Sequence, residues 1–183
     1  KGSFTKYIKL MIENVDKARE IISKSGAKSE KWFPWKPICK NCGKIITPYV
    51  TKVEDGIVHY VCQDYEFQKY KAYGCGHVDH ADPRVSRGKL FWKGEWAAQW
   101  ANWGVVSEGA GKEYNVPHSA FWINAEICEK IFDFPAPEPI FYEHLIIEGK
   151  KMSASVGNVV YPHEWSEVCD NEVLKMFLLK RIN

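Results

Sequence analysis

The chain has 183 residues, of which 45% are hydrophobic and 26% charged, and its formal net charge at pH 7 is +2. This composition is ordinary for a globular protein of one domain or two small ones, and it gives no strong electrostatic sign of a nucleic-acid-binding protein. No apolar run reaches the roughly 18 residues of a membrane-spanning helix, and the N-terminus lacks the apolar stretch of a signal peptide. We therefore expect a cytoplasmic protein whose six cysteines are reduced thiols or metal ligands.

The pattern of apolar residues in the first part of the chain predicts helices. Apolar residues recur at helical spacing through residues 4–26, which indicates one helix or two. The sequence WFPWKP at 32–37 contains two prolines, which no helix interior tolerates well, and we interpret it as an aromatic linker.

From residue 38 to about 78 the pattern changes to short β-rich runs. KIITPYVTKV and GIVHYVC are separated by Glu-Asp-Gly, which is typical of a hairpin turn. The same block begins with a CxxC knuckle followed by glycine and ends with Cys-Gly-His. Because zinc takes four soft donors in a tetrahedron, we predict a zinc site with ligands Cys39, Cys42, Cys62 and Cys75, and with His77 as the alternative to either of the last two.

Other interpretations of these cysteines remain open. They could be buried free thiols, or the CxxC could be a redox motif, although redox chemistry favours a CxxC at the start of a helix that follows a strand. Cys128 and Cys169 stand alone in helical patterns, and we predict that they are ordinary core residues.

A tryptophan-rich apolar segment occupies residues 90–106. Trp96, Trp100 and Trp103 are spaced by four and three, which places them on one face of a helix, and for the last two we expect a core position. Glu95 lies beside Trp96, and a carboxylate next to a large aromatic ring can recognise an ammonium group. The following GAGKEYN, at 109–115, is either a simple turn or a place where backbone and polar side chains approach a ligand.

The last third predicts a helix over 119–132, a strand over 140–149 and a helix over 171–182 with Asp170 or Asn171 as its cap and basic residues in its last turn. Between the strand and the final helix lies KKMSASVGNVV, residues 150–160. A flexible lysine and hydroxyl groups on such a loop can stabilise the charge that develops when an acid attacks the α-phosphate of ATP and pyrophosphate leaves. The alternative is a solvated turn.

Lys151-Met152-Ser153-Ala154-Ser155 resembles the KMSxS signature loop of class I aminoacyl-tRNA synthetases. Upstream, the CxxCG knuckle, the CGH, RGKLFWKGEWAAQW and GVVSEGAGKEY follow in the order found in class I lysyl-tRNA synthetases, so that the resemblance covers roughly residues 35–183. It implies an α/β fold: the C-terminal half of a Rossmann-like catalytic domain with a small β-rich, zinc-ribbon-like insertion and flanking helices. The implied parts are a helical segment and linker (1–36), the zinc-binding insertion (37–80), the second half of the catalytic domain (81–165) and the start of a helical domain (166–183).

The resemblance also implies a function. The parent enzyme would be a lysine–tRNA ligase that forms lysyl-adenylate from lysine and ATP, with Mg²⁺ accompanying the ATP and a structural Zn²⁺, and then transfers lysine to the 3′ end of tRNA. The residues implied at the lysine pocket and active site are Glu95, Trp96, Lys112, Glu113 and Tyr114. Those implied to hold the ATP phosphates are Lys151, Met152, Ser153 and Ser155, and we expect Lys151, Ser153 and Ser155 to be catalytic.

The chain departs from the family pattern in three places. It lacks the family's His-x-Gly-His motif, it has Glu113 and Tyr114 where the family has aspartate and histidine, and it has Val156 where the family tends to have lysine. We therefore expect part of a longer enzyme that does not aminoacylate alone. The alternatives are another class I synthetase, an inactive paralogue, or a non-catalytic zinc-ribbon module that binds nucleic acid through Lys36, Lys40, Lys44, Lys52, Lys69 and Lys71.

Overall fold

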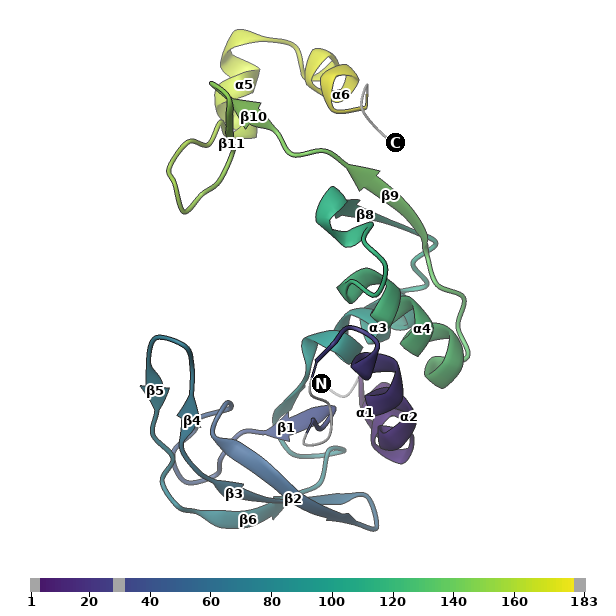
Figure 1. The fold of residues 1–183 in the computed structure, drawn as a ribbon, viewed down its shortest axis with the longest axis vertical. Helices are drawn as coiled ribbons and strands as arrows, with labels where there is room; N and C mark the ends of the chain where they lie inside the picture. The colour runs from purple at the N-terminus through teal and green to yellow at the C-terminus, as the bar shows by residue number, and fades with distance from the viewer. Residues whose placement is uncertain (1–3, 28–31, 180–183) are drawn as a thin grey trace.

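A computed structural model describes residues 4–27 and 32–179 of the chain. The described residues form an arc: a β-rich block at one end, a helical centre, and an arm formed by residues 143–179 at the other end (Figure 1). Within the described residues, no helix is both long enough and apolar enough to cross a bilayer.

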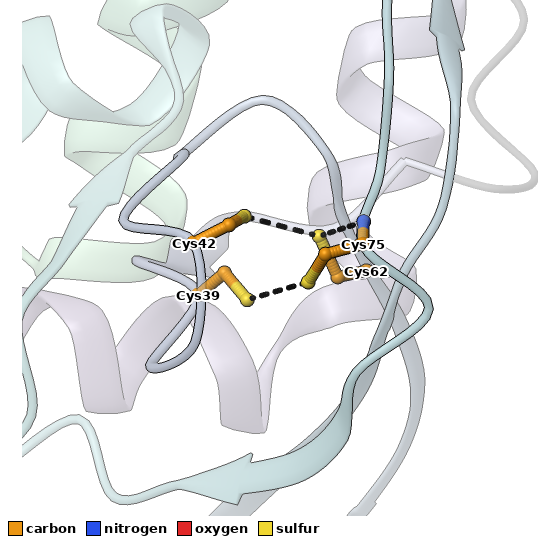
Figure 2. Close-up of side chains that lie close together, drawn as sticks. All are labelled: Cys39, Cys42, Cys62 and Cys75. Carbon is orange, nitrogen blue, oxygen red and sulfur yellow. Dashed lines mark hydrogen bonds between the residues drawn. The ribbon is translucent and has the colours of Figure 1, made fainter.

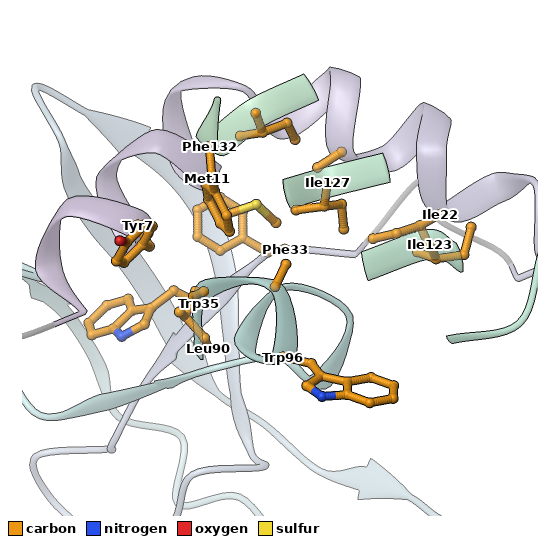
Figure 3. Close-up of a cluster of buried hydrophobic side chains, with 14 of the residues drawn as sticks. Tyr7, Met11, Ile22, Phe33, Trp35, Leu90, Trp96, Ile123, Ile127 and Phe132 are labelled. Atoms are coloured by element: carbon orange, nitrogen blue, oxygen red, sulfur yellow. The ribbon is translucent and has the colours of Figure 1, made fainter. Parts of the chain in front are cut away.

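Two short helices open the chain, as the helical spacing predicts. They are α1 (Thr5–Glu13) and α2 (Val15–Ser23), and the Asn14 side chain between them donates a hydrogen bond of 2.9 Å to the Leu10 carbonyl. Their apolar faces bury Met11, Ile21 and Ile22 in the main core, where they meet α4 (Figure 3).

The segment WFPWKP is part of the core, so the linker interpretation is wrong. Residues Trp35–Pro37 form strand β1, which pairs antiparallel with β7 (Gly88–Leu90), and the Trp35 side chain is only 1% exposed. The Trp35 ring lies so close to Gly88 that a Cβ there would meet it at 2.2 Å. The prolines are tolerated because they flank or end a short edge strand, where a missing N–H costs no ladder bond.

The cysteine block, residues 38–81, lies between these two paired strands. Its three-stranded antiparallel sheet has the order β2–β3–β6, with β2 Pro48–Glu54, β3 Ile57–Cys62 and β6 Val78–Ala81. Asp55 and Gly56, with φ of 50° and 77°, connect β2 to β3, which confirms the predicted hairpin turn. A second hairpin, β4 (Tyr65–Glu66) with β5 (Lys71–Ala72), projects from the sheet.

The helical centre leads into a β–α–β unit. Helix α3 (Trp92–Trp103) packs on α4 (Ala120–Phe132), and α4 connects two parallel strands, β8 (Ser107–Gly111) and β9 (Glu138–Tyr142). The predicted helix over 119–132 is thereby confirmed.

The tryptophans of α3 differ in burial according to their position along the helix. Trp100 is buried, as predicted, whereas Trp103 is 64% exposed, so its predicted core position is wrong. Trp103 is the last residue of α3, next to the left-handed Gly104 (φ 63°), and its ring lies nearly perpendicular to the Phe4 ring, with centroids 6.0 Å apart. Helical spacing therefore does not ensure burial for a residue at the end of its helix.

The arm contains a small hairpin and two helices. They are β10 (Ile146–Ile147), β11 (Lys150–Lys151), α5 (Pro162–Val168) and α6 (Asn171–Leu179). The strand predicted over 140–149 is thus interrupted after Tyr142, and the predicted basic turn of the last helix lies outside the described residues. None of the described residues 143–179 is buried. Cys169 is half-buried, so the prediction that it is a core residue is wrong. Cys128 in α4 is buried in the core, as predicted.

Candidate functional site

The structure brings four cysteines of the cysteine block to one point. The Sγ atoms of Cys39, Cys42, Cys62 and Cys75 all lie within 4.8 Å of one another (Figure 2). Two Sγ–Sγ distances, Cys39–Cys75 and Cys42–Cys62, are 3.7 and 3.6 Å. Four thiolates about 2.3 Å from a tetrahedral zinc ion are separated by about 3.8 Å, so these four sulfur atoms fit a closed zinc site.

Two glycine turns produce this geometry. Gly43 and Gly76, each directly after a cysteine, have φ of 70° and 74°, a conformation that a residue with a Cβ rarely adopts. The Gly43 N–H donates to the Cys39 carbonyl at 2.9 Å, and the Gly76 N–H donates to the Cys62 carbonyl at 2.8 Å. Each turn therefore points a pair of cysteines at the same centre.

The surroundings of the sulfur atoms suit a cationic ligand. Burial raises the pKa of the Cys39 thiol to about 11, so a thiolate there needs a compensating positive charge. A hydrogen bond from the Asn41 side chain lowers the pKa of the Cys75 thiol to about 6. Cys62 Sγ accepts from the Cys75 N–H at 3.4 Å and lies 3.2 Å from the Thr47 hydroxyl. Such second contacts orient metal-binding thiolates.

His77, the alternative ligand, does not belong to the described group of donors. Its Nε2 atom lies 3.4 Å from an Asp79 carboxylate oxygen, and Lys40 Nζ pairs with the same carboxylate at 3.0 Å. The backbone N–H of His80 lowers the pKa of Asp79 to about 2, so this carboxylate is an anion, which Lys40 pairs with and the His77 ring faces. The geometry thus favours four thiols over three thiols and an imidazole.

A second cluster lies where the parallel strands end. β8 and β9 run side by side to Gly111 and Tyr142, and the 3-10 turn η1 (Lys112–Tyr114) follows the first of them. Carboxyl ends of parallel strands are where α/β proteins bind ligands. Lys112 forms an ion pair with Glu143, and Glu113 Oε2 lies 3.6 Å from Nε2 of His144.

Trp96 joins this cluster from α3. Its side chain is nearly buried, stacks on Trp92 with ring centroids 4.9 Å apart, and meets the Tyr114 ring edge-to-face at 5.5 Å. The structure therefore brings Trp96 and Tyr114 together, as candidates for one pocket. Glu95, in contrast, pairs with Lys89 at 3.4 Å and is half-buried.

The signature loop begins directly beside this cluster. Nζ of Lys151 lies 3.2 Å from Nε2 of His144, and Met152 donates its N–H to the Leu145 carbonyl at 2.8 Å. The Ser153 and Ser155 hydroxyl oxygens are 2.9 Å apart. A pocket of about 700 Å³ opens between this hairpin and α6. It is lined by Ile140, Tyr142, Glu143, His144, Leu145, Ile146, Lys151, Met152, Phe177, Leu178 and Leu179.

Asn158 holds the signature loop closed on itself. Its Oδ1 accepts from the Ser153 N–H and its Nδ2 donates to the Lys151 carbonyl, both at 3.0 Å. Gly157, with φ of 81°, lets the chain turn back so that this amide reaches across the loop. The side chains of Lys151, Ser153 and Ser155 are thus attached to a backbone whose conformation is fixed by hydrogen bonds.

Sequence reasoning missed Glu143, His144 and the role of Asn158. The first two stand inside an apolar run that predicts one continuous strand, yet they are adjacent polar residues, which a strand with one buried face would not place together. That break in alternation is the signal that could have located the end of β9.

Comparisons with known proteins place the chain in a family. The family model described as tRNA synthetases class I (K) matches residues 1–183. Curated proteins named lysine–tRNA ligase are similar to the chain. That of Methanopyrus kandleri is 37% identical over 154 residues, 79% of this chain and 28% of the relative. Those of Haloarcula marismortui and Thermoplasma acidophilum are 36% and 30% identical over 98% and 100% of the chain. The chain spans about a third of the length of these relatives, 32% and 34% in the last two.

Proposed function

This chain belongs to the family of class I (K) tRNA synthetases, and from that membership we propose that it is part of an enzyme that activates lysine with ATP and transfers it to tRNA. The relatives named lysine–tRNA ligase support lysine as the amino acid. The observation that carries the proposal is the chain of contacts from Glu113 through His144 to Lys151, because it joins the strand ends to the signature loop.

We further propose that the β8–α4–β9 unit belongs to the second half of a Rossmann-like catalytic domain, over residues 81–165, and that residues 37–80 form a zinc-ribbon-like insertion in it. The β1–β7 ladder supports an insertion, because the chain enters and leaves the cysteine block through two paired strands. The Ile38 N–H extends that ladder by donating to the Arg87 carbonyl at 2.9 Å. Residues 166–183 would begin the next, helical domain.

In the first reaction, a lysine carboxylate oxygen attacks the α-phosphorus of ATP, the bond from that phosphorus to the bridging oxygen breaks, and pyrophosphate leaves. Lys151 and the hydroxyls of Ser153 and Ser155 would stabilise the charge that develops on the pyrophosphate, together with Mg²⁺ that accompanies ATP. In the second reaction, a hydroxyl at the 3′ end of tRNA attacks the carbonyl carbon of the adenylate, and AMP leaves.

The lysine substrate would lie against the aromatic pair of Trp96 and Tyr114. Its ε-ammonium group needs a carboxylate and gains from an aromatic face. Glu113, directly before Tyr114, lies at the strand ends, whereas Glu95 would have to leave Lys89 to reach a ligand. Lys112 forms an ion pair with Glu143 and would hold the Glu143 carboxylate in place at the edge of the lysine pocket.

Zn²⁺ held by Cys39, Cys42, Cys62 and Cys75 would be structural, because four protein ligands leave no open position for a substrate. The ion would fix the two glycine turns to each other and so shape the whole cysteine block.

Pyrophosphate exchange by the full-length protein tests the function. We expect exchange of labelled pyrophosphate into ATP that depends on lysine and on no other amino acid. Exchange that depends on a different amino acid would keep the chemistry and refute the lysine assignment. Absence of exchange with every amino acid, in a protein that still binds ATP, would instead support an inactive paralogue.

A further inference from the structure

The connection from β9 to β10 places an imidazole ring between two charged side chains of the candidate site. His144 is the second residue after β9, and its side chain is half-buried, with 23% exposed. Its Nε2 atom lies 3.2 Å from Nζ of Lys151 and 3.6 Å from Oε2 of Glu113. An ammonium group and a carboxylate therefore approach the same ring nitrogen from two different segments, the signature hairpin and the turn η1.

One nitrogen cannot form a hydrogen bond with both neighbours at once. An ammonium group can only donate, so in the contact with Lys151 the Nε2 atom is the acceptor, and the ring is neutral with its proton on Nδ1. A carboxylate can only accept, so Glu113 could bond to this nitrogen only if Nε2 carried the proton. The contact with Glu113 is longer than a hydrogen bond, whereas the contact with Lys151 is not. The geometry therefore assigns the nitrogen to the lysine.

Glu113 keeps its negative charge for a ligand because the lysine next to it in sequence is engaged elsewhere. Lys112 forms its ion pair with Glu143. The Glu113 carboxylate folds back over the end of β8, where a Cβ at Gly111 would collide with it, and its side chain is about half exposed, 51%. The carboxylate is thus presented to solvent at the strand ends, where the proposed function places the ammonium group of the substrate.

Lys151 and Glu113 have to stay apart for the proposed reaction. The lysine is needed on the pyrophosphate and the carboxylate on the substrate, yet opposite charges this close attract each other. An ion pair between them would occupy both groups before either substrate bound. In the structure Lys151 contacts the His144 ring and not the carboxylate. The ring gives the ammonium group a neutral acceptor, and such a hydrogen bond is weaker than the charge-assisted contacts that a phosphate offers.

We infer that His144 is a positioning residue that holds Lys151 away from Glu113, and so keeps the lysine pocket open to the substrate until the phosphates of ATP draw Lys151 away. The inference rests on the proposed function, because it takes Glu113 as the carboxylate that receives the ammonium group of the substrate. In this role His144 acts only through the two side chains beside it, by deciding which partner each of them finds.

Lysine affinities of full-length variants, measured by calorimetry without ATP, test this role. His144→Leu removes the acceptor, so Lys151 should pair with Glu113 and lower the affinity for lysine about three- to tenfold, the competition expected of one partly exposed ion pair. Removing the competing cation should undo this loss, so the double variant His144→Leu, Lys151→Ala should have the unsubstituted affinity within about twofold. His144→Gln, which again offers a neutral acceptor, should retain the affinity as well.

The adjacent lysine provides the matched control. Lys150 is not among the residues that line the pocket, so the double variant His144→Leu, Lys150→Ala should bind lysine as weakly as His144→Leu alone. A loss of affinity that persists when Lys151 is also replaced would mean that the ring acts only by packing, and it would overturn the inference. Unchanged affinity in His144→Leu would overturn it too. Unfolding temperatures of all variants show whether each retains the fold.

Nitrogen-15 NMR of the full-length enzyme, labelled on histidine, tests the same assignment without a substitution at the site. In the free enzyme, above about pH 7.5 where an unperturbed imidazole is neutral, Nε2 of His144 should give the signal of an unprotonated nitrogen. Its absence from the spectrum of His144→Gln identifies that signal. A protonated Nε2 would contradict the inference.

Failure of the proposed function would be seen separately from failure of this inference. An unsubstituted full-length enzyme that binds no lysine, or that exchanges pyrophosphate without it, would refute the function and with it the role of Glu113. An enzyme that binds lysine and shows lysine-dependent exchange, but whose His144→Leu variant keeps the full affinity, would retain the function and lose only the role of His144.

Discussion

Lys151 and Lys150 are neighbours in the signature hairpin, but only one of them faces the candidate site. Both are exposed in strand β11, where successive side chains point to opposite faces. Lys151 reaches the His144 ring, and it lines the pocket beside the strand ends, where Lys150 is not among the lining residues. One charge can therefore act on a phosphate there, and its neighbour serves as an internal control.

We predict that Lys151→Ala in the full-length enzyme slows lysyl-adenylate formation about 100-fold or more, the usual effect of removing one preorganised donor from developing charge. The affinity for lysine should change by less than about twofold, because the lost contact is made in the transition state and not with the amino acid. Stopped-flow adenylation and calorimetric lysine binding measure the two quantities. Lys150→Ala should leave both nearly unchanged. Equal losses of rate and lysine affinity in the Lys151 variant would contradict the role assigned to it.

At the scale of elements, the cysteine block is organised around its four sulfur atoms and not around a large apolar core. Its buried side chains include Val58, Tyr60 and Cys62 of β3, and the adjoining turns are held by glycine geometry. A bound metal would tie these turns together, since metal affinity becomes folding free energy when the unfolded chain has no preformed site.

We predict that the purified chain carries one zinc ion and that Cys42→Ser removes it, with a large fall in unfolding temperature. Native mass spectrometry and thermal unfolding measure the two effects. Cys169→Ser, at a half-buried cysteine outside the cluster, should retain the ion, and so should His77→Ala, because His77 faces Asp79. Loss of zinc in the His77 variant, with retention in the Cys42 variant, would refute the four-thiol assignment.

The ladder of β1 and β7 depends on a close approach at Gly88. We predict that Gly88→Ala destabilises the chain by about 3 kcal/mol or more, as overpacking does when rigid atoms cannot move aside. Gly56→Ala is the matched comparison: its Cβ meets nothing within 4 Å, so only the positive φ adds a cost, about 1 kcal/mol. Denaturant unfolding gives both values. Equal destabilisation by the two substitutions would show that Trp35 yields easily and that the ladder is not rigid.

The same elements show what local sequence predicts. The Asp55–Gly56 turn was predictable because few residues accept two successive positive φ angles, and α4 was predictable from its period. β1 was not, since its partner lies some fifty residues further on and its prolines resemble a linker. The convergence of the four cysteines was predictable from their spacing, whereas the position of His77 outside their group depends on where Asp79 lies.

Across the whole molecule, burial is unevenly distributed along the arc. The core joins α1, α2, α3, α4 and β1, while no described residue after Tyr142 is buried. The β8–β9 pair contains two strands only, so both outer edges are without a strand partner among the described residues. The contacts of His144 with Glu113 and Lys151 therefore depend on an arm that few apolar contacts hold in place. Sequence patterns located the loop itself, but they could not locate these contacts, because they join residues across three separate segments.

This distribution predicts local stabilities that differ along the chain. Amides of the arm, residues 143–179, should exchange with deuterium much faster than those of α2, α3 and α4, since regions with few buried apolar contacts open at low free-energy cost. Mass-spectrometric hydrogen exchange of the chain measures this directly. In the full-length protein, the arm should become protected if other segments cover the strand edges and the apolar residues of α6, such as Phe177 and Leu179. Protection of the arm equal to that of α4 in the chain alone would contradict the prediction. It would mean that contacts within this chain are sufficient to hold the signature loop in place.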